Sequence, residues 1–432
     1  MPVRVLCTGD FHIGRRASKV PETFRSADAW GQIVSLAIAV QVDAVAISGD
    51  VVDKESKSYE AMGPLESGLQ RLSAAGIAAV SISGNHDFDV LHRLAEGTGS
   101  GALVMLGAKG TWERYTLKTR EGEYLHIDGW SFPAEHVARN PLHEYRPTPE
   151  DATPVLGMVH CDVGVPGSQY APVSLHDLTA HSHVDLWLLG HIHIPRPFPS
   201  ATEVRSLYPG SPLAMDPGES GAHGVWIVGF EQGHVPRVEL RVTSPVRYLQ
   251  HKLDVSHISD EAGFRESLGQ LARSPGRELL KEHQPGSLRY ISCRLDVVGR
   301  NPLHQSIKAW CATAATEIGS LPIDGMASLH IDAITCNVLP AIDLEAYAQS
   351  RNPAGEAAKL ILRLREEHPG PPYDELIRST VEHMNRVYQH SAYAQLHALE
   401  PDRGASEDDA RELLQQEAGA LLSTLVSQRE SA

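Results

Sequence analysis

The sequence predicts an α/β fold, in which a layered N-terminal domain precedes a small α+β domain and a helical C-terminal region. Between residues 3 and 190, short apolar runs typical of buried strands alternate with stretches of helical periodicity. Polar residues repeatedly follow these runs, where the carboxyl end of a strand would lie. Beyond residue 341 the pattern becomes helical and charged. These observations favour β-α-β units whose functional groups gather at one edge of a sheet.

The composition is that of a globular protein with more than one domain. The 432 residues are enough for two or three domains, and the hydrophobic content of 42% allows a sizeable core. The formal net charge of -16 argues against a basic surface that coats nucleic acid, although bound metal ions could supply positive charge locally. No CxxC pair occurs, which predicts reduced cysteines rather than a zinc cluster or a disulfide framework. The cysteines are Cys7, Cys161, Cys293, Cys311 and Cys336.

Neither a signal peptide nor a membrane-spanning segment is indicated by the sequence. A strand pattern begins directly after Met1 and Pro2, without the charged and apolar regions of a signal peptide. The longest apolar region, residues 33–47, is interrupted by Gln41 and Asp43 and is too short to span a bilayer. We therefore expect a cytoplasmic protein.

The first two predicted strands each end in acidic residues or histidine. Residues 3–7 lead into Asp10 and His12, and residues 43–48 lead into Asp50 and Asp53. Residues 30–40 between them read as a helix. An isolated Asp-x-His is more often a turn with an incidental histidine, so the repetition of the pattern is what indicates a site.

Three further strands continue this arrangement. Residues 77–82 lead into the tetrapeptide Gly84-Asn85-His86-Asp87, which taken alone is either a turn that caps the helix at 90–95 or part of a site. Residues 154–159 lead into His160, and residues 186–189 lead into His191 and His193. Between them, residues 112–119 and 123–128 predict a hairpin.

The chemistry of the combined set points to a pair of divalent metal ions. Two such ions about 3.5 to 4 Å apart can clamp the attacking and leaving oxygens of a phosphoester displacement. They require carboxylate and imidazole ligands and one anionic group that bridges them. Asp50 is the natural bridge because a carboxylate has one oxygen for each ion, and the glycines before Asp10, Asp50, Asn85 and His191 would let the backbone turn sharply. His86 could protonate the leaving oxygen or stabilise the transferring phosphoryl group.

The ordered series D-x-H, GD-x-x-D, GNHD, H and GH-x-H resembles the calcineurin-like metallophosphoesterase superfamily. The resemblance implies a two-sheet sandwich flanked by helices, with strands at 203–207, 225–230 and 238–242 completing the second sheet. Within the superfamily the chain resembles the SbcD group of DNA repair exonucleases. The residues that carry this second resemblance are Tyr170-Ala171-Pro172, Ser174-Leu175, Asp177-Leu178, Tyr208-Pro209-Gly210-Ser211-Pro212, Glu219 and Gly224.

The resemblance also implies a role for each site residue. One ion would be held by Asp10, His12, Asp50 and His193, and the other by Asp50, Asn85, His160 and His191. His86 matches the catalytic histidine of the superfamily, and Asp53 and Asp87 would orient ligands. Manganese is the ion that the resemblance implies, although magnesium, iron and zinc fit the same ligand types.

Two segments near the predicted site bear on the choice of substrate. Arg15 and Arg16 follow the first metal motif and either contact phosphate or form a solvated basic pair. Ala214-Met215-Asp216-Pro217 is acidic and apolar where a DNA path would be basic. The resemblance implies a metal-dependent DNA exonuclease or endonuclease of DNA repair. The alternatives are a small-substrate nucleotide phosphoesterase and a non-catalytic scaffold.

The sequence predicts three parts: a catalytic domain at 1–247, an α+β accessory domain at 248–340 and a helical region at 341–432. The accessory domain either caps the active site, as in the SbcD group, or serves packing or dimerisation. The C-terminal helices are predicted at 354–367, 374–388 and 407–427, separated by segments rich in proline and glycine at 369–372 and 401–404. In the SbcD group such helices dock on an SbcC-type ATPase; here they could equally pack against the accessory domain. A homodimer is implied by the resemblance alone.

Overall fold

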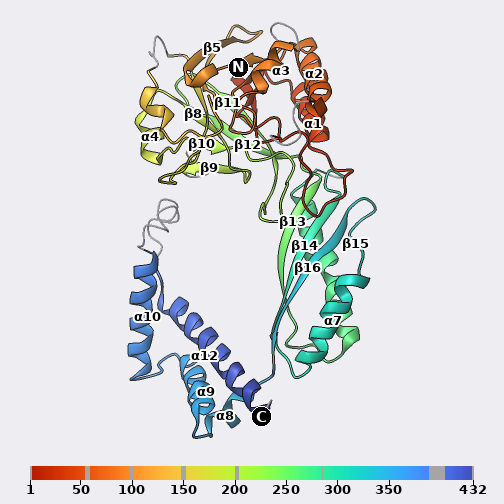
Figure 1. Ribbon diagram of the computed structural model, residues 1–432, viewed down its shortest axis with the longest axis vertical. Coiled ribbons are helices and arrows are strands. Elements are labelled where there is room, and N and C mark those ends of the chain that lie inside the picture. The colour runs from red at the N-terminus through yellow and green to blue at the C-terminus, as the bar shows by residue number, and fades with distance from the viewer. Residues whose placement is uncertain are drawn as a thin grey trace. The chain divides into compact units, whose positions relative to one another are not determined.

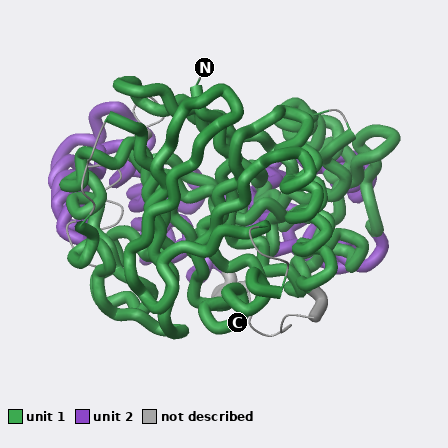
Figure 2. The backbone as a smooth tube through the Cα atoms, turned by 90° about the horizontal axis from the view of Figure 1, so that it is seen from above, with its two compact units in different colours: residues 1–251, 268–295, 318–333 green, residues 252–267, 296–317, 334–432 purple. Residues whose placement is uncertain are grey.

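The computed structural model describes residues 2–53, 59–97, 102–146, 152–199, 204–284, 286–388 and 404–430. The chain divides into two compact units, which Figure 2 distinguishes by colour. The first comprises residues 1–251, 268–295 and 318–333, and the second comprises residues 252–267, 296–317 and 334–432. The division into three domains at 247 and 340 stays a prediction.

One six-stranded sheet carries the first three ligand motifs, and its strand order is β12-β11-β1-β2-β3-β4. Strands β1 to β4 run parallel, and β11 pairs antiparallel with both β1 and β12. Helices α1 and α2 link the successive parallel strands, as the predicted β-α-β units require. The elements are β1 (Val3–Thr8), α1 (Ser26–Ala39), β2 (Ala44–Ile47), α2 (Tyr59–Ala74), β3 (Ala78–Ser81), α3 (Leu91–Gly97), β4 (Val104–Met105), β11 (Gly224–Phe230) and β12 (Arg237–Val242).

A second six-stranded sheet carries the histidine motifs, in the order β5-β6-β7-β8-β10-β9. Its central strands β6, β7, β8 and β10 are parallel, and β5 and β6 form the predicted antiparallel hairpin. The elements are β5 (Trp112–Lys118), β6 (Tyr124–Trp130), β7 (Val155–His160), α4 (Leu175–Ala180), β8 (Leu186–Gly190), β9 (Arg196–Pro199) and β10 (Val204–Tyr208). Two 3-10 turns, η1 (Ala108–Gly110) and η2 (Pro141–Glu144), connect them.

The two sheets face each other across a common apolar core. Val5 and Cys7 of β1 belong to the same buried cluster as Leu156 and Met158 of β7. A second cluster joins the outer face of the first sheet to α1 and α2, and a third lies on the outer face of the second sheet, next to α4. Figure 1 shows α1 and α2 on one side of the sandwich and α4 on the other. Strands buried on both faces read as continuous apolar runs, which explains their clear sequence signal.

A smaller four-stranded sheet follows, in the order β13-β14-β16-β15. Its alternating strands and helices confirm the α+β character predicted for this part of the chain, although α6 and β15 were not predicted. The elements are β13 (Val246–Asp254), α5 (Glu261–Leu271), the π-helical turn η3 (Ala272–Gly276), α6 (Arg277–Lys281), β14 (Tyr290–Arg300), α7 (His304–Glu317), β15 (Leu321–Pro322) and β16 (Ser328–Leu339).

The C-terminal region is helical, as predicted. It contains α8 (Leu344–Ala348), α9 (Pro353–Leu364), α10 (Tyr373–Tyr388) and α12 (Glu407–Glu430). Ala358 and Ile361 of α9 pack with Leu422 and Val426 of α12 in a small buried cluster. The short α8 was not predicted, and most of the predicted separator at 401–404 lies outside the described residues.

None of the described helices is both long enough and apolar enough to cross a membrane. All five cysteines are free thiols; four are buried and Cys336 is half-buried. Burial raises the pKa of the Cys7 thiol well above its usual value. The cysteines therefore match the prediction of reduced residues in or near the core.

Candidate metal centre

The loops that follow β1 and β2 are joined by backbone hydrogen bonds. The N–H of Asp10 donates to the carbonyl oxygen of Gly49 at 3.0 Å, and the N–H of His12 donates to that of Asp50 at 3.0 Å. Because neighbouring parallel strands end at the same edge, these bonds extend the sheet into its loops and bring both acidic motifs together.

The first group of candidate ligands comprises Asp10, His12 and His193, whose ligand atoms lie within 4.8 Å of one another. The Nε2 atoms of His12 and His193 are 3.1 Å apart. Asp10 accepts a hydrogen bond from the N–H of His191 through Oδ1, at 3.1 Å. Its Oδ2 is buried and has no hydrogen-bond partner among the described residues. A cation would satisfy this carboxylate oxygen and both imidazole lone pairs.

The second group converges on the side-chain oxygen of Asn85. This Oδ1 lies 3.1 Å from Nε2 of His160 and 3.2 Å from Nδ1 of His191. Nδ1 of His160 lies 2.9 Å from the carbonyl oxygen of Ser48. A carbonyl can only accept, so Nδ1 carries the proton and the Nε2 lone pair is directed at the group. Asn85, His160 and His191 are thus arranged as three ligands of a single ion.

Asp50 lies between the two groups. Its Oδ2 is 3.7 Å from Nε2 of His12, in the first group, and 3.4 Å from Nε2 of His160, in the second. Its Oδ1 accepts a hydrogen bond from the backbone N–H of His86 at 2.9 Å. Oδ1 thus meets a backbone donor while Oδ2 faces both groups, and a role of each Asp50 oxygen toward one ion stays a prediction.

Burial sets the charge states of these side chains. It raises the pKa of Asp10, while His160 and His193 oppose the shift. Burial also disfavours ionised Asp50, but the neighbouring His160 outweighs it and holds the Asp50 pKa well below its usual value. Conversely, burial would lower the pKa of His160, yet Asp50 and Asp10 outweigh it and raise that pKa to about 9. Burial and the charge of His160 lower the pKa of His191 to about 3, so its ring is neutral and can ligate.

The backbone of the ligand loops adopts conformations that ordinary residues avoid. Eight described non-glycine residues have a positive φ, and four of them are predicted ligands: Asp10 (51°), His12 (46°), Asp50 (50°) and His191 (96°). Such strain clusters at functional sites because the surrounding structure enforces it.

The predicted role of the glycines is only partly correct. Gly49 has a φ of 95° and provides a sharp turn. Gly84 has no positive φ; instead, a Cβ at Gly84 would lie 2.1 Å from Oδ1 of Asp50. Close approach of the backbone, rather than a turn, accounts for the glycine at this position.

His86 lies at the mouth of the site with its side chain one-third exposed, and Nδ1 is 3.6 Å from Oδ1 of Asp53. The same Asp53 oxygen lies 3.5 Å from Nδ1 of His12. Asp87 is fully buried, and its carboxylate accepts hydrogen bonds from the N–H groups of Gly84 (2.8 Å) and Val51 (2.7 Å). Asp87 therefore links the loops that contain Val51 and Gly84, whereas Asp53 lies next to the imidazole rings of His12 and His86.

Two carboxylates next to the site were not predicted as site residues. Oε1 of Glu219 lies 2.6 Å from Nδ1 of His193, and Oδ1 of Asp162 lies 3.3 Å from Nε2 of His191. Glu219 appeared only as a residue supporting the SbcD resemblance. Asp162 follows His160 by two positions at a strand end, the same spacing that separates Asp10 from His12, and this repetition could have identified it.

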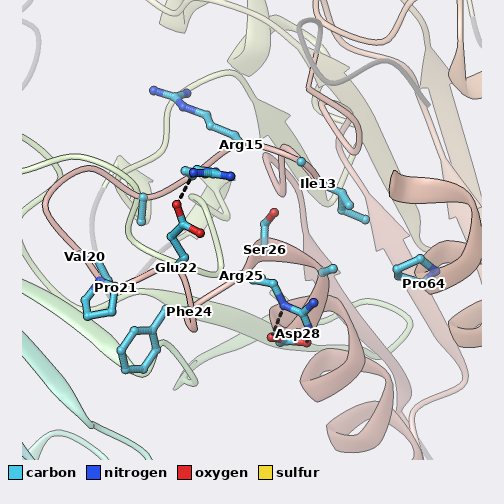
Figure 3. Close-up of a pocket in the computed structure, with 14 residues that line it drawn as sticks. Ile13, Arg15, Val20, Pro21, Glu22, Phe24, Arg25, Ser26, Asp28 and Pro64 are labelled. Atoms are coloured by element: carbon cyan, nitrogen blue, oxygen red, sulfur yellow. Dashed lines mark hydrogen bonds and ion pairs between the residues drawn. The ribbon is translucent and has the colours of Figure 1, made fainter. Parts of the chain in front are cut away.

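The two arginines after the first motif differ in their surroundings. A cavity of about 630 Å³ is lined by residues 13–17, 20–22 and 24–28 together with Pro64 (Figure 3). Arg16 forms an ion pair with Glu22. Arg15 forms no ion pair within the described part of the chain, and Figure 3 shows its side chain extending away from Phe24. The backbone N–H of Arg15 donates to the carbonyl oxygen of His12 at 2.8 Å, which places Arg15 next to a predicted ligand.

The acidic and apolar segment at 214–217 has a structural explanation. Ala214 and Met215 are 0% and 1% exposed and belong to a buried cluster with Ala17 and Tyr248. Their apolar character reflects packing, whereas Asp216 of the same segment is exposed and keeps it acidic at the surface.

The donor set fits divalent metal ions. Asp10, His12, Asp50, His86, His160 and His193 supply three overlapping groups of ligand atoms, and Asn85 and His191 extend them. Carboxylate, amide and imidazole ligands of this kind suit manganese, iron, zinc or magnesium and do not select among them. The side chain of Asp10 is fully buried, so a bound cation would offset the cost of its negative charge.

The sequence profile of the calcineurin-like phosphoesterases matches residues 3–195. The uncharacterized metallophosphoesterase YhaO of Bacillus subtilis is 28% identical over 265 residues, 60% of this chain and 62% of its own length. The DNA double-strand break repair protein Mre11 of Haloferax volcanii is 32% identical over 200 residues, 44% of this chain and 42% of its own length. The chain thus spans less than two thirds of each relative.

A crystal structure of a dimetal phosphatase from Danio rerio aligns with 56% of this chain and 99% of its own, with a TM-score of 0.34 and 12% identity. The α/β fold class predicted from the sequence is confirmed by the two sheets and their flanking helices. Residues 3–195, which contain every predicted metal ligand, are thus similar to the calcineurin-like phosphoesterases.

Proposed function

We propose that the chain is a nuclease that hydrolyses phosphodiester bonds of DNA with two divalent metal ions. The observation that carries the proposal is the position of Asp50, whose Oδ2 faces His12 of one ligand group and His160 of the other. A buried carboxylate shared by two sets of ligands is what a binuclear centre needs. When bound, the two ions would neutralise charge on the phosphoryl group and activate water for in-line attack.

The protein side chains supply the remaining steps. His86 is the general acid: its ring lies beside the ligand groups, 4.7 Å from that of His12, and is partly exposed to an incoming substrate. In this role it donates a proton to the leaving oxygen. Asp53, 3.6 Å from Nδ1 of His86, orients the ring and stabilises its protonated form. Asp87 holds the backbone of the Gly84 and Val51 loops, and thereby the positions of Asn85 and Asp50.

DNA is favoured as the substrate by two considerations. One is the similarity to Mre11 of Haloferax volcanii, which is named as a DNA double-strand break repair protein. The other is Arg15, which lies beside the ligands without an ion pair in the described residues and lines a cavity large enough for a nucleotide. The chain's charge of -16 makes such a local cationic group more important, since the surface as a whole repels DNA.

The cofactor proposed is a pair of manganese ions; magnesium, iron and zinc remain alternatives because the ligand types accept all of them. An SbcC-type ATPase as partner, docking on the C-terminal helices, and a homodimer both stay predictions. Leu376, Leu413 and Leu421 are exposed leucines on α10 and α12 where such a partner could bind.

The proposal is tested by manganese-dependent digestion of end-labelled single- and double-stranded DNA beside a small chromogenic phosphodiester. We expect the wild type to cleave DNA, and Asp50→Ala to lose turnover of both substrates because both ligand groups lose their shared anion. Turnover of the small ester alone would indicate a nucleotide phosphodiesterase, and turnover of neither substrate by a metal-loaded protein would favour the scaffold.

Arg15 and Arg16 provide a matched pair for the same assay. Arg15→Gln should raise KM for DNA about tenfold by removing one phosphate contact, which corresponds to about 1.4 kcal/mol. Arg16→Gln should change KM little, because Arg16 is already paired with Glu22 at the surface. Equal effects of the two substitutions would remove Arg15 from the substrate site.

A further inference from the structure

We propose that Glu219 and Asp162 are positioning residues of the metal centre, each fixing the tautomer of one histidine of the GH-x-H motif. This inference rests on the binuclear site of the proposed function. Both residues lie outside the ligand set. Glu219 contacts His193 of the first ligand group, and Asp162 contacts His191 of the second.

Glu219 holds His193 from the side opposite the ligands. Its Oε1 lies 2.6 Å from Nδ1 of His193, whose Nε2 is 3.1 Å from Nε2 of His12. A carboxylate can only accept, so Nδ1 must carry the proton and the Nε2 lone pair is directed at the first group. The carboxylate is itself fixed, because Oε2 accepts from the N–H of Met215 at 2.8 Å and from the hydroxyl of Ser211 at 3.2 Å.

Asp162 faces the other nitrogen of His191 and favours the opposite tautomer. Its Oδ1 lies 3.3 Å from Nε2 of His191, and Nδ1 of that ring is 3.2 Å from Oδ1 of Asn85. A proton on Nε2 leaves the Nδ1 lone pair for the second group. Asp162 accepts a hydrogen bond from the Ser168 hydroxyl, and the ring of Tyr170 lies over His191 with centroids 4.8 Å apart.

The two histidines are separated by one residue yet must present different nitrogens to the ions. The shared backbone cannot set this difference, so the outer carboxylates set it. Partners of this kind also make the ligating nitrogen more basic, and their loss typically weakens metal binding by about 10- to 100-fold.

The amide substitutions separate positioning from charge. In Glu219→Gln, the side-chain oxygen must take the place of Oε2, because Met215 presents an N–H there. The amide NH₂ then faces Nδ1 of His193 and forces its proton onto Nε2, toward the ion. In Asp162→Asn the partner is a hydroxyl, which can donate or accept, so the amide can turn its oxygen to His191.

The experiment titrates manganese into metal-free wild type, Glu219→Gln, Glu219→Ala and Asp162→Asn, with calorimetry for affinity and electron paramagnetic resonance for pairing. Asp216→Asn is the matched control, since Asp216 is exposed in the same loop. Thermal melting of the metal-free proteins verifies folding. We expect Glu219→Gln to weaken the binding of one manganese ion by about 10- to 100-fold. Its spectrum should be that of a single manganese ion, whereas the wild type should show a coupled pair.

Glu219→Ala should bind that ion more tightly than Glu219→Gln, because a water molecule can accept the hydrogen bond from Nδ1 of His193. Asp162→Asn should lower manganese affinity less than Glu219→Gln does. Two ions bound with wild-type affinity by Glu219→Gln would overturn the inference, as would a wild type that binds fewer than two. A wild type that binds two ions but does not cleave DNA would contradict the proposed nuclease activity and would not contradict this inference.

Discussion

The sheet sandwich and the C-terminal helices bury different kinds of side chain. In the sandwich, Asp10, Asp87 and His160 are 0% exposed and Asp50 is 2% exposed, all at or beside the ends of strands. In the described residues beyond 341, Ser423 is the sole buried polar side chain, and the remaining buried residues are aliphatic, alanine, glycine or proline. Buried charge without full pairing costs stability, so it is retained where it serves a ligand. The difference locates chemistry in the sandwich and leaves packing to the helices.

The largest expected effect of a single substitution that spares the metal ligands is that of His86→Ala. This variant should retain both ions, because the two ligand groups do not depend on His86, but lose about 10²- to 10⁴-fold in turnover as the general acid disappears. Metal content by mass spectrometry and kcat on a phosphodiester measure the two properties separately. His176→Ala, at an exposed position of α4, is the control and should match the wild type. Retained turnover with intact metal content would remove His86 from the mechanism.

The sequence predicted the sandwich well because its signal is physical and local. Strands β1, β2, β3, β7 and β8 are buried on both faces and therefore appear as short uninterrupted apolar runs. Elements with a weaker apolar signal were missed, among them the two-residue β4, the short α4 and α8, and the edge strand β9. The α1 helix begins at Ser26, four residues before the predicted start.

The candidate site was predicted as a set of residues but not as a geometry. Asp10, Asp50 and Asn85 could be identified because each follows a strand end. Glu219 could not be placed beside His193 from the sequence, since 26 residues separate them and only folding brings them into contact. The orientation of the Asp50 carboxylate likewise depends on the N–H of His86, a backbone contact that no side-chain pattern reveals.

The next prediction tests whether the helices contribute packing alone. Leu422 of α12 is 0% exposed, whereas its neighbour Leu421 is 55% exposed. Leu422→Ala should lower the stability of the helical region by about 2 to 5 kcal/mol through a cavity, and Leu421→Ala by less than about 0.5 kcal/mol. Hydrogen exchange of the α9 and α12 amides measures the loss. Turnover of a small phosphodiester should be unchanged in both variants, and a fall in kcat with Leu422→Ala would show that the helices act on the metal centre.

The smallest expected effect comes from adding one methyl group in each of two places within the sandwich. At Gly84 the new Cβ would lie 2.1 Å from Oδ1 of Asp50, so Gly84→Ala should cost about 1 to 3 kcal/mol and also weaken metal binding. At Gly31, in the middle of α1, no atom lies within 4 Å of the new Cβ, and Gly31→Ala should stabilise the protein by about 0.5 to 1 kcal/mol. Denaturation midpoints with and without manganese separate the two contributions. If manganese stabilises Gly84→Ala as strongly as the wild type, Asp50 tolerates the displacement and the backbone contact is structural, not part of the ligand geometry.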